Sequence, residues 1–249
     1  MKKKNVLMMA MSLVLVAVIA VGGTLAYLTS NTDTLTNTFT VGNGYDDDPD
    51  NPALKLDETE KGVGSNPTMI DPDNRTNENN YEAFAPGSKI AKDPTFYLKD
   101  GSPASFVFAK VTGVDTLVDT EWIIVSDLEA ASVQNDTPSA LSEEWQKVAN
   151  ADGELITGEN PDNGKLDGYY VYTGAYDYTV VTKEGYRSLD PLFKSVVVKS
   201  NLTDMTAIAA ANDANIVVKG VAIQADNMAD AAAAFAALNG ETAASDFFA

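Results

Sequence analysis

The stretch Gly22–Gly42, GGTLAYLTSNTDTLTNTFTVG, joins an apolar N-terminal run to a threonine-rich segment. In the second half polar and apolar residues roughly alternate, with Leu35, Phe39 and Val41 as the apolar members. Alternation and threonine both favour an extended strand, which we expect over about residues 34–41. The chain is therefore predicted to begin its folded part with a β-prone segment.

The residues before this stretch have the pattern of an export signal. Residues 2–4 are lysines, and Val6–Val21 is apolar except for Ser12. A basic segment followed by an apolar run shorter than the ~20 residues of a membrane span is typical of a signal peptide. The small residues that end the run place the predicted cleavage between Ala26 and Tyr27. A retained N-terminal anchor is the alternative.

The charge of the chain restricts its partners. The 249 residues include 17 Lys and Arg against 36 Asp and Glu, a formal net charge of −19, which becomes −22 when the three lysines of residues 2–4 are removed. Such a charge repels nucleic acid and anionic lipid, so we expect neither nucleic acid nor, after cleavage, a membrane as a direct partner. The expected partners are a signal peptidase during export and further copies of the chain.

Two residue types are missing from the sequence. It contains no histidine and no cysteine, which excludes a Ser-His-Asp triad, an H-E-x-x-H zinc site, a cysteine nucleophile and a disulfide framework. Carboxylate pairs can perform acid–base chemistry, but no pair stands out among 36 acidic residues. We therefore expect a protein that is not an enzyme and has no cofactor, calcium excepted.

Composition divides the chain into four parts. We expect a signal peptide at 1–26, an N-terminal strand at 27–42, an acidic flexible loop at 43–82 and a β-sandwich domain at 83–249. The segment 43–82 holds 11 acidic residues, 3 basic residues and four prolines, and it has few large apolar groups with which to offset its ordering entropy. Short strands near 54–56 or 68–70 are an alternative within it.

Short β-prone runs separated by turn residues fill the rest of the chain. We expect strands at 89–98, 105–111, 122–125, 169–173, 176–182, 191–199 and 215–225. The residues around Trp145 fit either a helical stripe or a short strand. A helix is expected at 228–238, capped by Asp226 or Asn227. Many strands and one late helix predict an all-β sandwich with a long acidic loop.

Calcium is the metal that the sequence suggests. Asp46, Asp48, Asp50 and Asp57 occupy the first, third, fifth and twelfth positions of a calcium loop. The glycine expected at the sixth position is absent, and no helices flank the loop. A looser oxygen-ligand site would draw on these residues or on Asp71, Asp73 and Asp162. The alternative, which we favour, is a solvated acidic loop.

Five tyrosines lie close together in the sequence: Tyr169, Tyr170, Tyr172, Tyr176 and Tyr178. They would form either an exposed sugar-binding face or part of the packing of a sandwich. Tyrosines in strands commonly bury their rings and extend their hydroxyls to the edge of the sheet. We therefore expect packing.

The chain also resembles a known family. GGTLAYLTS followed by NTFTVGN resembles the export signals cleaved by SipW-type signal peptidases, which head the TasA/camelysin group of Gram-positive surface and biofilm-matrix proteins. The similarity extends over FAPGSKIAKDPTF, PASFVFAKV, GYYVY, LFKSVVV and IVVKGVAIQAD, but not over the acidic segment. The resemblance implies a jelly-roll sandwich and fibres built by donor-strand assembly at the cell surface or in an extracellular matrix.

The N-terminal strand carries the functional hypothesis. Strand addition to an open sheet edge would satisfy its backbone, while Leu35, Phe39 and Val41 would enter pockets on the next subunit. Head-to-tail repetition of this contact would build a filament. Alternatively, the segment pairs within its own subunit as a first strand, and one chain could do both. A monomeric surface module for a glycan or host protein and a camelysin-like peptidase are the remaining hypotheses.

Overall fold

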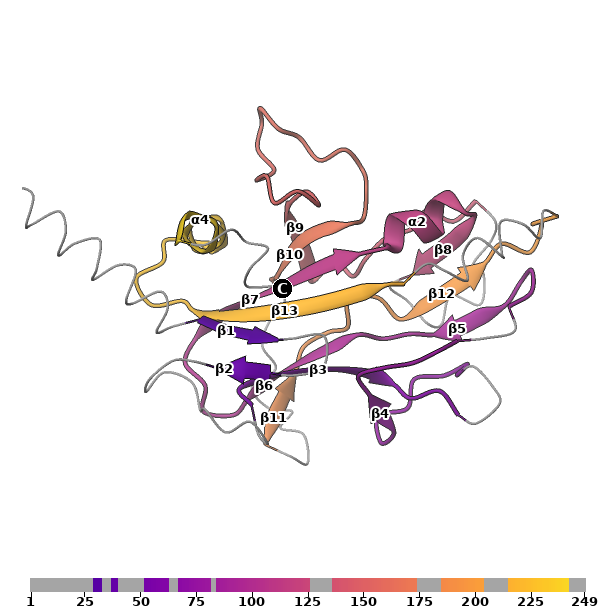
Figure 1. Cartoon of the computed structure of the whole chain (residues 1–249), viewed down its shortest axis with the longest axis horizontal. Helices are drawn as coiled ribbons and strands as arrows, with labels where there is room; N and C mark the ends of the chain where they lie inside the picture. The colour runs from indigo at the N-terminus through magenta and orange to yellow at the C-terminus, as the bar shows by residue number, and fades with distance from the viewer. Residues whose placement is uncertain are drawn as a thin grey trace, which may run out of the picture.

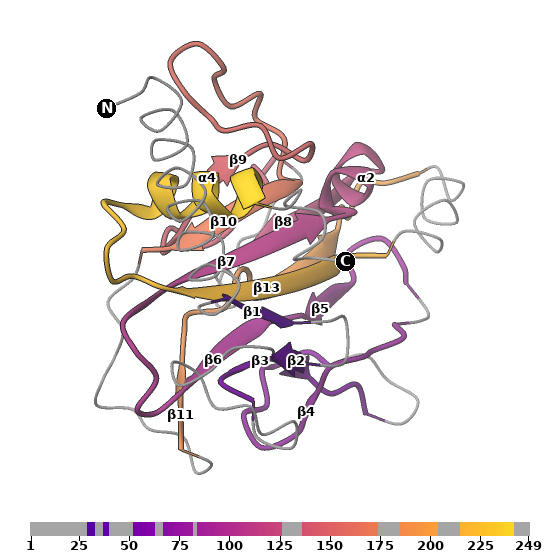
Figure 2. The same cartoon turned by 60° about the vertical axis from the view of Figure 1, so that its left-hand side comes forward.

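The two longest strands, β7 (Ser105–Thr112) and β13 (Val217–Gln224), lie side by side at the centre of a six-stranded antiparallel sheet (Figures 1 and 2). The computed structural model describes residues 29–32, 37–39, 52–62, 67–81, 84–125, 136–173, 185–203 and 215–241. The order of this sheet is β2-β1-β13-β7-β10-β9. Its other strands are β1 (Thr29–Thr32), β2 (Asn37–Phe39), β9 (Trp145–Ala149) and β10 (Gly168–Tyr172).

Two smaller antiparallel sheets complete the strands, in the orders β11-β6-β3-β4 and β5-β12-β8. Their members are β3 (Leu54–Thr59), β4 (Arg75–Thr76), β5 (Lys89–Ala91), β6 (Thr95–Lys99), β8 (Trp122–Val125), β11 (Tyr186–Ser188) and β12 (Ser195–Val198). The expected all-β class is confirmed, with three sheets where two were expected. Among the described residues the helices are α2 (Val114–Asp119) and α4 (Ala231–Glu241), neither long and apolar enough to cross a membrane.

The two smaller sheets continue into one another. The predicted strand 89–98 is divided into β5 and β6 by residues 92–94, and β11 and β12 are separated by residues 189–194 beside that gap. Leu189 donates its backbone N–H to the carbonyl of Phe96 at 2.8 Å, which extends the pairing of β11 with β6 towards the gap. Because β5 pairs with β12 and β6 with β11, two neighbouring chain segments run through both sheets.

The main core is shared by all three sheets. It takes in Val107, Ala109 and Val111 from β7, Leu54 from β3, Phe96 from β6, and Val196 and Val198 from β12. These β7 and β12 residues are two positions apart, the period with which a strand presents one face. One face of the six-stranded sheet therefore packs on the two smaller sheets.

The opposite face of the six-stranded sheet is covered by α4. Phe108, Tyr169 and Ile223 pack there against Phe235 and Leu238 of the helix. Burial of this face explains why apolar residues of β7 and β13 point to both sides of the sheet, because each strand contributes to a core on both faces.

The start of α4 differs from the prediction. The helix begins at Ala231 rather than Met228, because Asp230 acts as its cap in place of Asp226 or Asn227. The Asp230 carboxylate accepts a hydrogen bond from Ala233 N at 2.8 Å. A side-chain oxygen that satisfies a free N–H of the first turn fixes the residue at which a helix begins.

The second half of the acidic segment is ordered into strands. The prediction of a flexible loop over 43–82 is wrong for β3 and β4, since Leu54 is fully buried and β3 pairs with β6. The alternative of a strand near 54–56 is the correct one. At Trp145 the structure has strand β9, not a helix, whereas α2 was not predicted. The predicted strand 176–182 lies outside the described residues.

Gly220 of β13 lies against the ring of Phe96 in β6, and its replacement by alanine is expected to destabilise the protein. An added Cβ would lie 2.1 Å from Cε1 of Phe96, which is fully buried. Overpacking of a core typically costs about 1–3 kcal/mol. Urea denaturation should show this loss for Gly220→Ala, while Gly158→Ala, with no atom within 4 Å of the new Cβ, should differ little from wild type. Equal midpoints for the two variants would contradict the packing argument.

Candidate assembly edge and buried polar cluster

The N-terminal segment forms a hairpin-like pair at one edge of the six-stranded sheet. β1 pairs antiparallel with β13 through Thr29–Ile223, Ser30–Ala222 and Asn31–Val221. β2 pairs only with β1 among the described strands, with Ser30 opposite Phe39. In Figures 1 and 2 β1 lies beside β13 and β2 lies beyond it, both away from α4. β1 thus covers the backbone edge of β13 that β7 leaves open.

Of the predicted assembly and cleavage residues, the structure describes Phe39, which is the last residue of β2. Leu35, Val41, Ala26 and Tyr27 lie outside the described residues. The strand that contacts the body of the protein is β1, which precedes the predicted strand at about 34–41.

Of the four predicted calcium ligands, the structure describes Asp57. Its Oδ1 accepts a hydrogen bond from Arg75 Nε at 2.8 Å, so the carboxylate already has a cationic partner. Asp46, Asp48 and Asp50 lie outside the described residues. Within the described part of the chain no three His, Cys, Asp or Glu residues are grouped as a metal site would require.

The other predicted oxygen ligands are also separate. Asp71 accepts hydrogen bonds from the backbone N–H groups of Asp73 and Asn74, as in a turn. Asp162 forms an ion pair with Lys147 at 3.1 Å, in a different part of the chain. The structure does not bring these residues together with Asp57.

Arg75 is the centre of a buried polar cluster that the sequence analysis missed. Besides Asp57 it forms an ion pair with Asp93, whose side chain is 3% exposed, and it donates to Thr59 Oγ1 at 3.2 Å. The second oxygen of Asp93 accepts from Thr59 N at 2.8 Å. Arg75 is one of only two arginines in the sequence and lies in an acidic segment, which is the signal that could have indicated it.

Burial and ion pairing have opposite effects on the pKa values of Asp57 and Arg75. Burial raises the pKa of the Asp57 carboxyl above its ordinary value, although the Arg75 charge lowers it in part. Burial alone would lower the pKa of the Arg75 guanidinium, but its ion pairs with Asp93 and Asp57 outweigh burial and raise it. The guanidinium therefore remains charged and holds β4 against β3.

A second group of polar residues surrounds Glu58, which is 7% exposed. Its carboxylate accepts from Lys92 Nζ at 2.5 Å, from Asn79 Nδ2 at 2.8 Å and from the hydroxyl of Tyr81 at 3.1 Å. Burial, and then the charge of Glu58, raise the pKa of the Tyr81 phenol, so this hydroxyl stays protonated as a donor. The group is satisfied internally and neutral overall.

The tyrosines of β10 belong to the packing. Tyr169, Tyr170 and Tyr172 are at most 5% exposed, and Tyr172 donates its hydroxyl to Asp190 at 2.8 Å. These three tyrosines therefore pack in the sandwich, as predicted, and do not form an exposed sugar-binding face. Tyr176 and Tyr178 lie outside the described residues.

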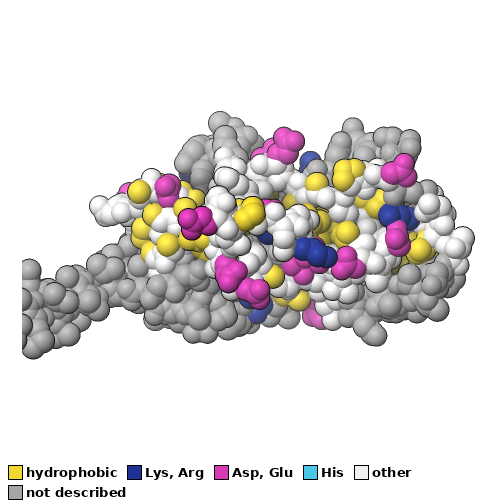
Figure 3. Space-filling model, turned by 90° about the horizontal axis from the view of Figure 1, so that it is seen from above, with side chains coloured by type: hydrophobic (Ala, Val, Ile, Leu, Met, Phe, Trp, Pro, Cys, Tyr) yellow, Lys and Arg dark blue, Asp and Glu magenta, His cyan; other side chains and the backbone are white. Residues whose placement is uncertain are grey.

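Charged side chains are dispersed on the face drawn in Figure 3. Acidic groups are scattered there among uncharged atoms, with a few basic groups between them. Among the described side chains on that face, the acidic groups do not gather into one patch that would bind a cation.

Comparison with protein-family models, with curated proteins and with solved structures found no match for this chain. We therefore infer the function from the sequence and from the contacts described above.

Proposed function

We propose that this chain is an exported, non-enzymatic structural subunit that assembles by exchange of its N-terminal strand. The observation that carries the proposal is the position of β1, which covers the β13 edge through three residue pairs. β13 is held on its other side by eight pairs with β7. The position of β13 in the sheet therefore does not depend on its pairing with the short strand β1.

The β13 edge is suited to accept the same strand from another molecule. Without β1 its backbone N–H and C=O groups would lack ladder partners, and an unpaired edge of this kind is a template for strand addition. A strand supplied by a neighbour would restore the same hydrogen bonds. Because each subunit would donate its strand to the next and accept one from the previous subunit at its own β13 edge, the contact repeats head to tail and builds a filament.

The proposal includes the finer fold and the location. We propose a jelly-roll-like sandwich, supported by the way β5–β6 and β11–β12 continue through both smaller sheets on one side of the six-stranded sheet. Secretion to the cell surface or an extracellular matrix is supported by the signal pattern at 1–26. The TasA/camelysin resemblance points to the same assignment.

Deletion of the exchanged strand tests the proposal. We expect the mature chain from Tyr27 to form fibres in negative-stain electron microscopy and the chain from Gly42 to form none, because the second lacks β1 and β2. Both chains are to be examined with and without calcium, which also tests the predicted Asp46–Asp57 loop. Fibres of equal abundance from the two chains would refute strand exchange.

A single substitution provides a matched control. Ser30 pairs with Ala222 on one side and Phe39 on the other, and proline at this position removes a backbone donor. Ser30→Pro should therefore reduce fibre formation strongly, while Ser30→Ala, which keeps the N–H, should not. Thermal unfolding of the monomers distinguishes loss of assembly from loss of the fold.

A further inference from the structure

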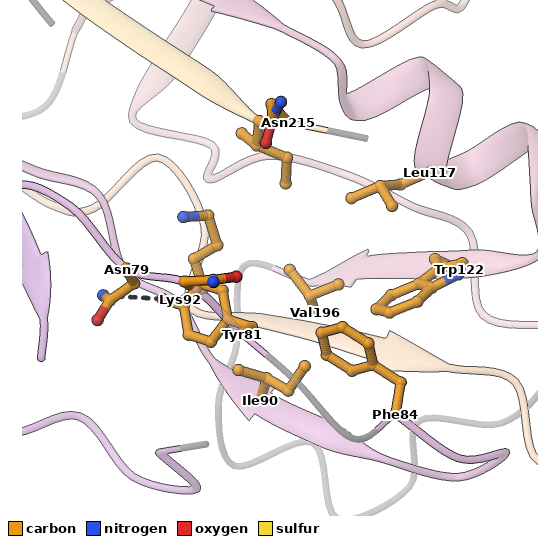
Figure 4. A pocket seen from close by; sticks show the side chains of 11 residues that line it. Asn79, Tyr81, Phe84, Ile90, Lys92, Leu117, Trp122, Val196 and Asn215 are labelled. Carbon is orange, nitrogen blue, oxygen red and sulfur yellow. Dashed lines mark hydrogen bonds between the residues drawn. The ribbon is translucent and has the colours of Figure 1, made fainter. Parts of the chain in front are cut away.

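A pocket of about 140 Å³ lies where the residues between β4 and β5 meet α2, β8 and the start of β13 (Figure 4). Its lining combines three aromatic rings, three asparagine side chains and one lysine with aliphatic groups. It is distinct from the N-terminal strand and the β1–β13 pairing. Its volume is close to that of a cavity that holds one benzene ring.

One end of the pocket is apolar. The rings of Phe84 and Trp122 meet edge to face, with centroids 4.8 Å apart and planes at 77°. Figure 4 shows these two rings at one end, with Leu117 on one side and Ile90 towards Tyr81. Aromatic walls of this kind bind the apolar face of a flat or ring-shaped ligand.

Two amides in the lining are available for a ligand. Asn80 and Asn215 are exposed, and their side chains make no hydrogen bond to any residue that the structure describes. Asn79 differs, because its amide is already bound to Glu58 and Tyr81. Each free amide offers both donors and an acceptor, which is the set that a hydroxyl group can use in either direction.

The described lining of the pocket carries no unbalanced charge. Lys92 is the charged residue of its lining, and Glu58 neutralises it at 2.5 Å. An anionic ligand would need a free cation and a cationic ligand a free carboxylate, and the lining provides neither. The strongly negative net charge of the chain further disfavours anions.

The lining also contains an unsatisfied donor. Trp122 is 3% exposed, and its indole Nε1 has no hydrogen-bond partner among the described residues. Buried donors without a partner are rare in folded proteins, because a lost hydrogen bond is costly. Because the nitrogen itself is buried, a ligand in the pocket would contact the Trp122 ring rather than accept from this N–H.

We propose that this pocket binds one neutral sugar ring. The aromatic end takes the apolar face of the ring, and Asn80 and Asn215 bind its hydroxyls. A ring without hydroxyls would leave both amides unused, and a charged sugar would lack a counter-charge. A single ring of this size is expected to bind with a Kd on the order of 1 mM.

The two tryptophans of the chain provide the measurement. In ¹H–¹⁵N spectra of the mature chain, the indole N–H of Trp122 should shift as methyl glycosides of glucose, galactose, mannose or N-acetylglucosamine are added. Trp145 is the internal control, because its Nε1 already donates to the Asp190 carbonyl at 2.8 Å. Trp122→Phe assigns the two signals.

Asparagine variants and a charged sugar test whether the pocket binds a neutral sugar through its two amides. Replacing both Asn80 and Asn215 by alanine should weaken sugar binding about 10-fold or more, since two hydrogen bonds are lost. Asn163→Ala, at an exposed asparagine outside the pocket, should leave it unchanged. Glucuronate should bind at least about 10-fold more weakly than the methyl glucoside.

Two results would overturn the proposal. One is the absence of any Trp122 shift with all four glycosides at concentrations about 100 times the expected Kd. The other is a shift with phenol that equals the sugar shift and persists in the double asparagine variant, which would identify an apolar ring site. Neither result bears on fibre formation, which depends on β1.

Discussion

Replacing Arg75 by alanine is expected to lower the free energy of unfolding by about 3–5 kcal/mol, the usual cost of leaving buried charges without their partner. Asp93 would lose its ion pair at 3% exposure, and Asp57 would lose a hydrogen bond of 2.8 Å. β4 would also lose the side-chain hydrogen bonds that Arg75 donates to Asp57 and Thr59 of β3. Urea denaturation at neutral pH measures the effect.

An exposed ion pair provides the control for Arg75. Lys165 and Asp119 lie 3.2 Å apart with side chains that are 50% and 67% exposed. Lys165→Ala should cost less than about 1 kcal/mol, because solvent screens such a pair. Similar losses for Lys165→Ala and Arg75→Ala would show that burial does not set the strength of the Arg75 cluster.

The cost of losing Arg75 should also depend on pH. The pKa of Asp57 is raised by burial and lowered in part by Arg75, so removing Arg75 raises it further. The folded variant then binds protons more tightly than the folded wild type, and its relative stability improves as pH falls through the raised pKa. The difference between the two proteins should therefore shrink between about pH 7 and about pH 4. A difference that grows on acidification would contradict this assignment.

Phe235→Ala is expected to produce a loss of similar size, about 3–5 kcal/mol for a fully buried phenylalanine. Its ring lies 5.7 Å from that of Phe108 and 5.2 Å from that of Tyr169, measured between centroids. The substitution removes the side chain through which α4 contacts both β7 and β10. Loss of that contact should release the helix and expose the apolar face of the six-stranded sheet.

Dye binding and denaturation together test this role of α4. Phe235→Ala should increase the fluorescence of a dye that binds apolar surface, at a urea concentration where the wild type does not. Ala236→Ser, at an exposed position of the same helix, should cost about 0.5 kcal/mol through helix propensity alone. If both variants lose equally little stability, α4 does not stabilise the packing on its face of the six-stranded sheet.

The sequence was sufficient for strands that are apolar or alternate clearly. β8, with WIIV, lies where the pattern predicts it, and β7 differs from its prediction by one residue. β12, with SVVV, occupies Ser195–Val198, the second half of the predicted strand 191–199. The break at Pro94 between β5 and β6 carried a local signal, since proline ends a ladder. The predicted start of α4 was too early because Asp226, Asn227 and Asp230 are all residue types that cap helices. The local sequence does not select Asp230, the residue that caps the helix in the structure.

The prediction of a flexible loop over 43–82 was wrong for β3 and β4 because the overall composition of a segment does not show which single residues are buried or paired. β3 is stabilised by burial of Leu54 and by Arg75, a single cation whose partners Asp57 and Asp93 come from separate strands or turns. The pocket was also beyond prediction. Its aromatic and amide groups come from three distant parts of the chain, and no local spacing links Phe84 and Trp122 to Asn215.

The position of β13 has a consequence for the order of folding. This strand lies between β1 and β7 in the sheet, yet it follows both of them in the chain, more than a hundred residues after β7 (Ser105–Thr112 to Val217–Gln224). During synthesis the central sheet therefore cannot close before β13 has left the ribosome, and contacts between such distant residues form slowly. Until then the nascent chain stays open, which is the state that a protein-translocating channel can thread.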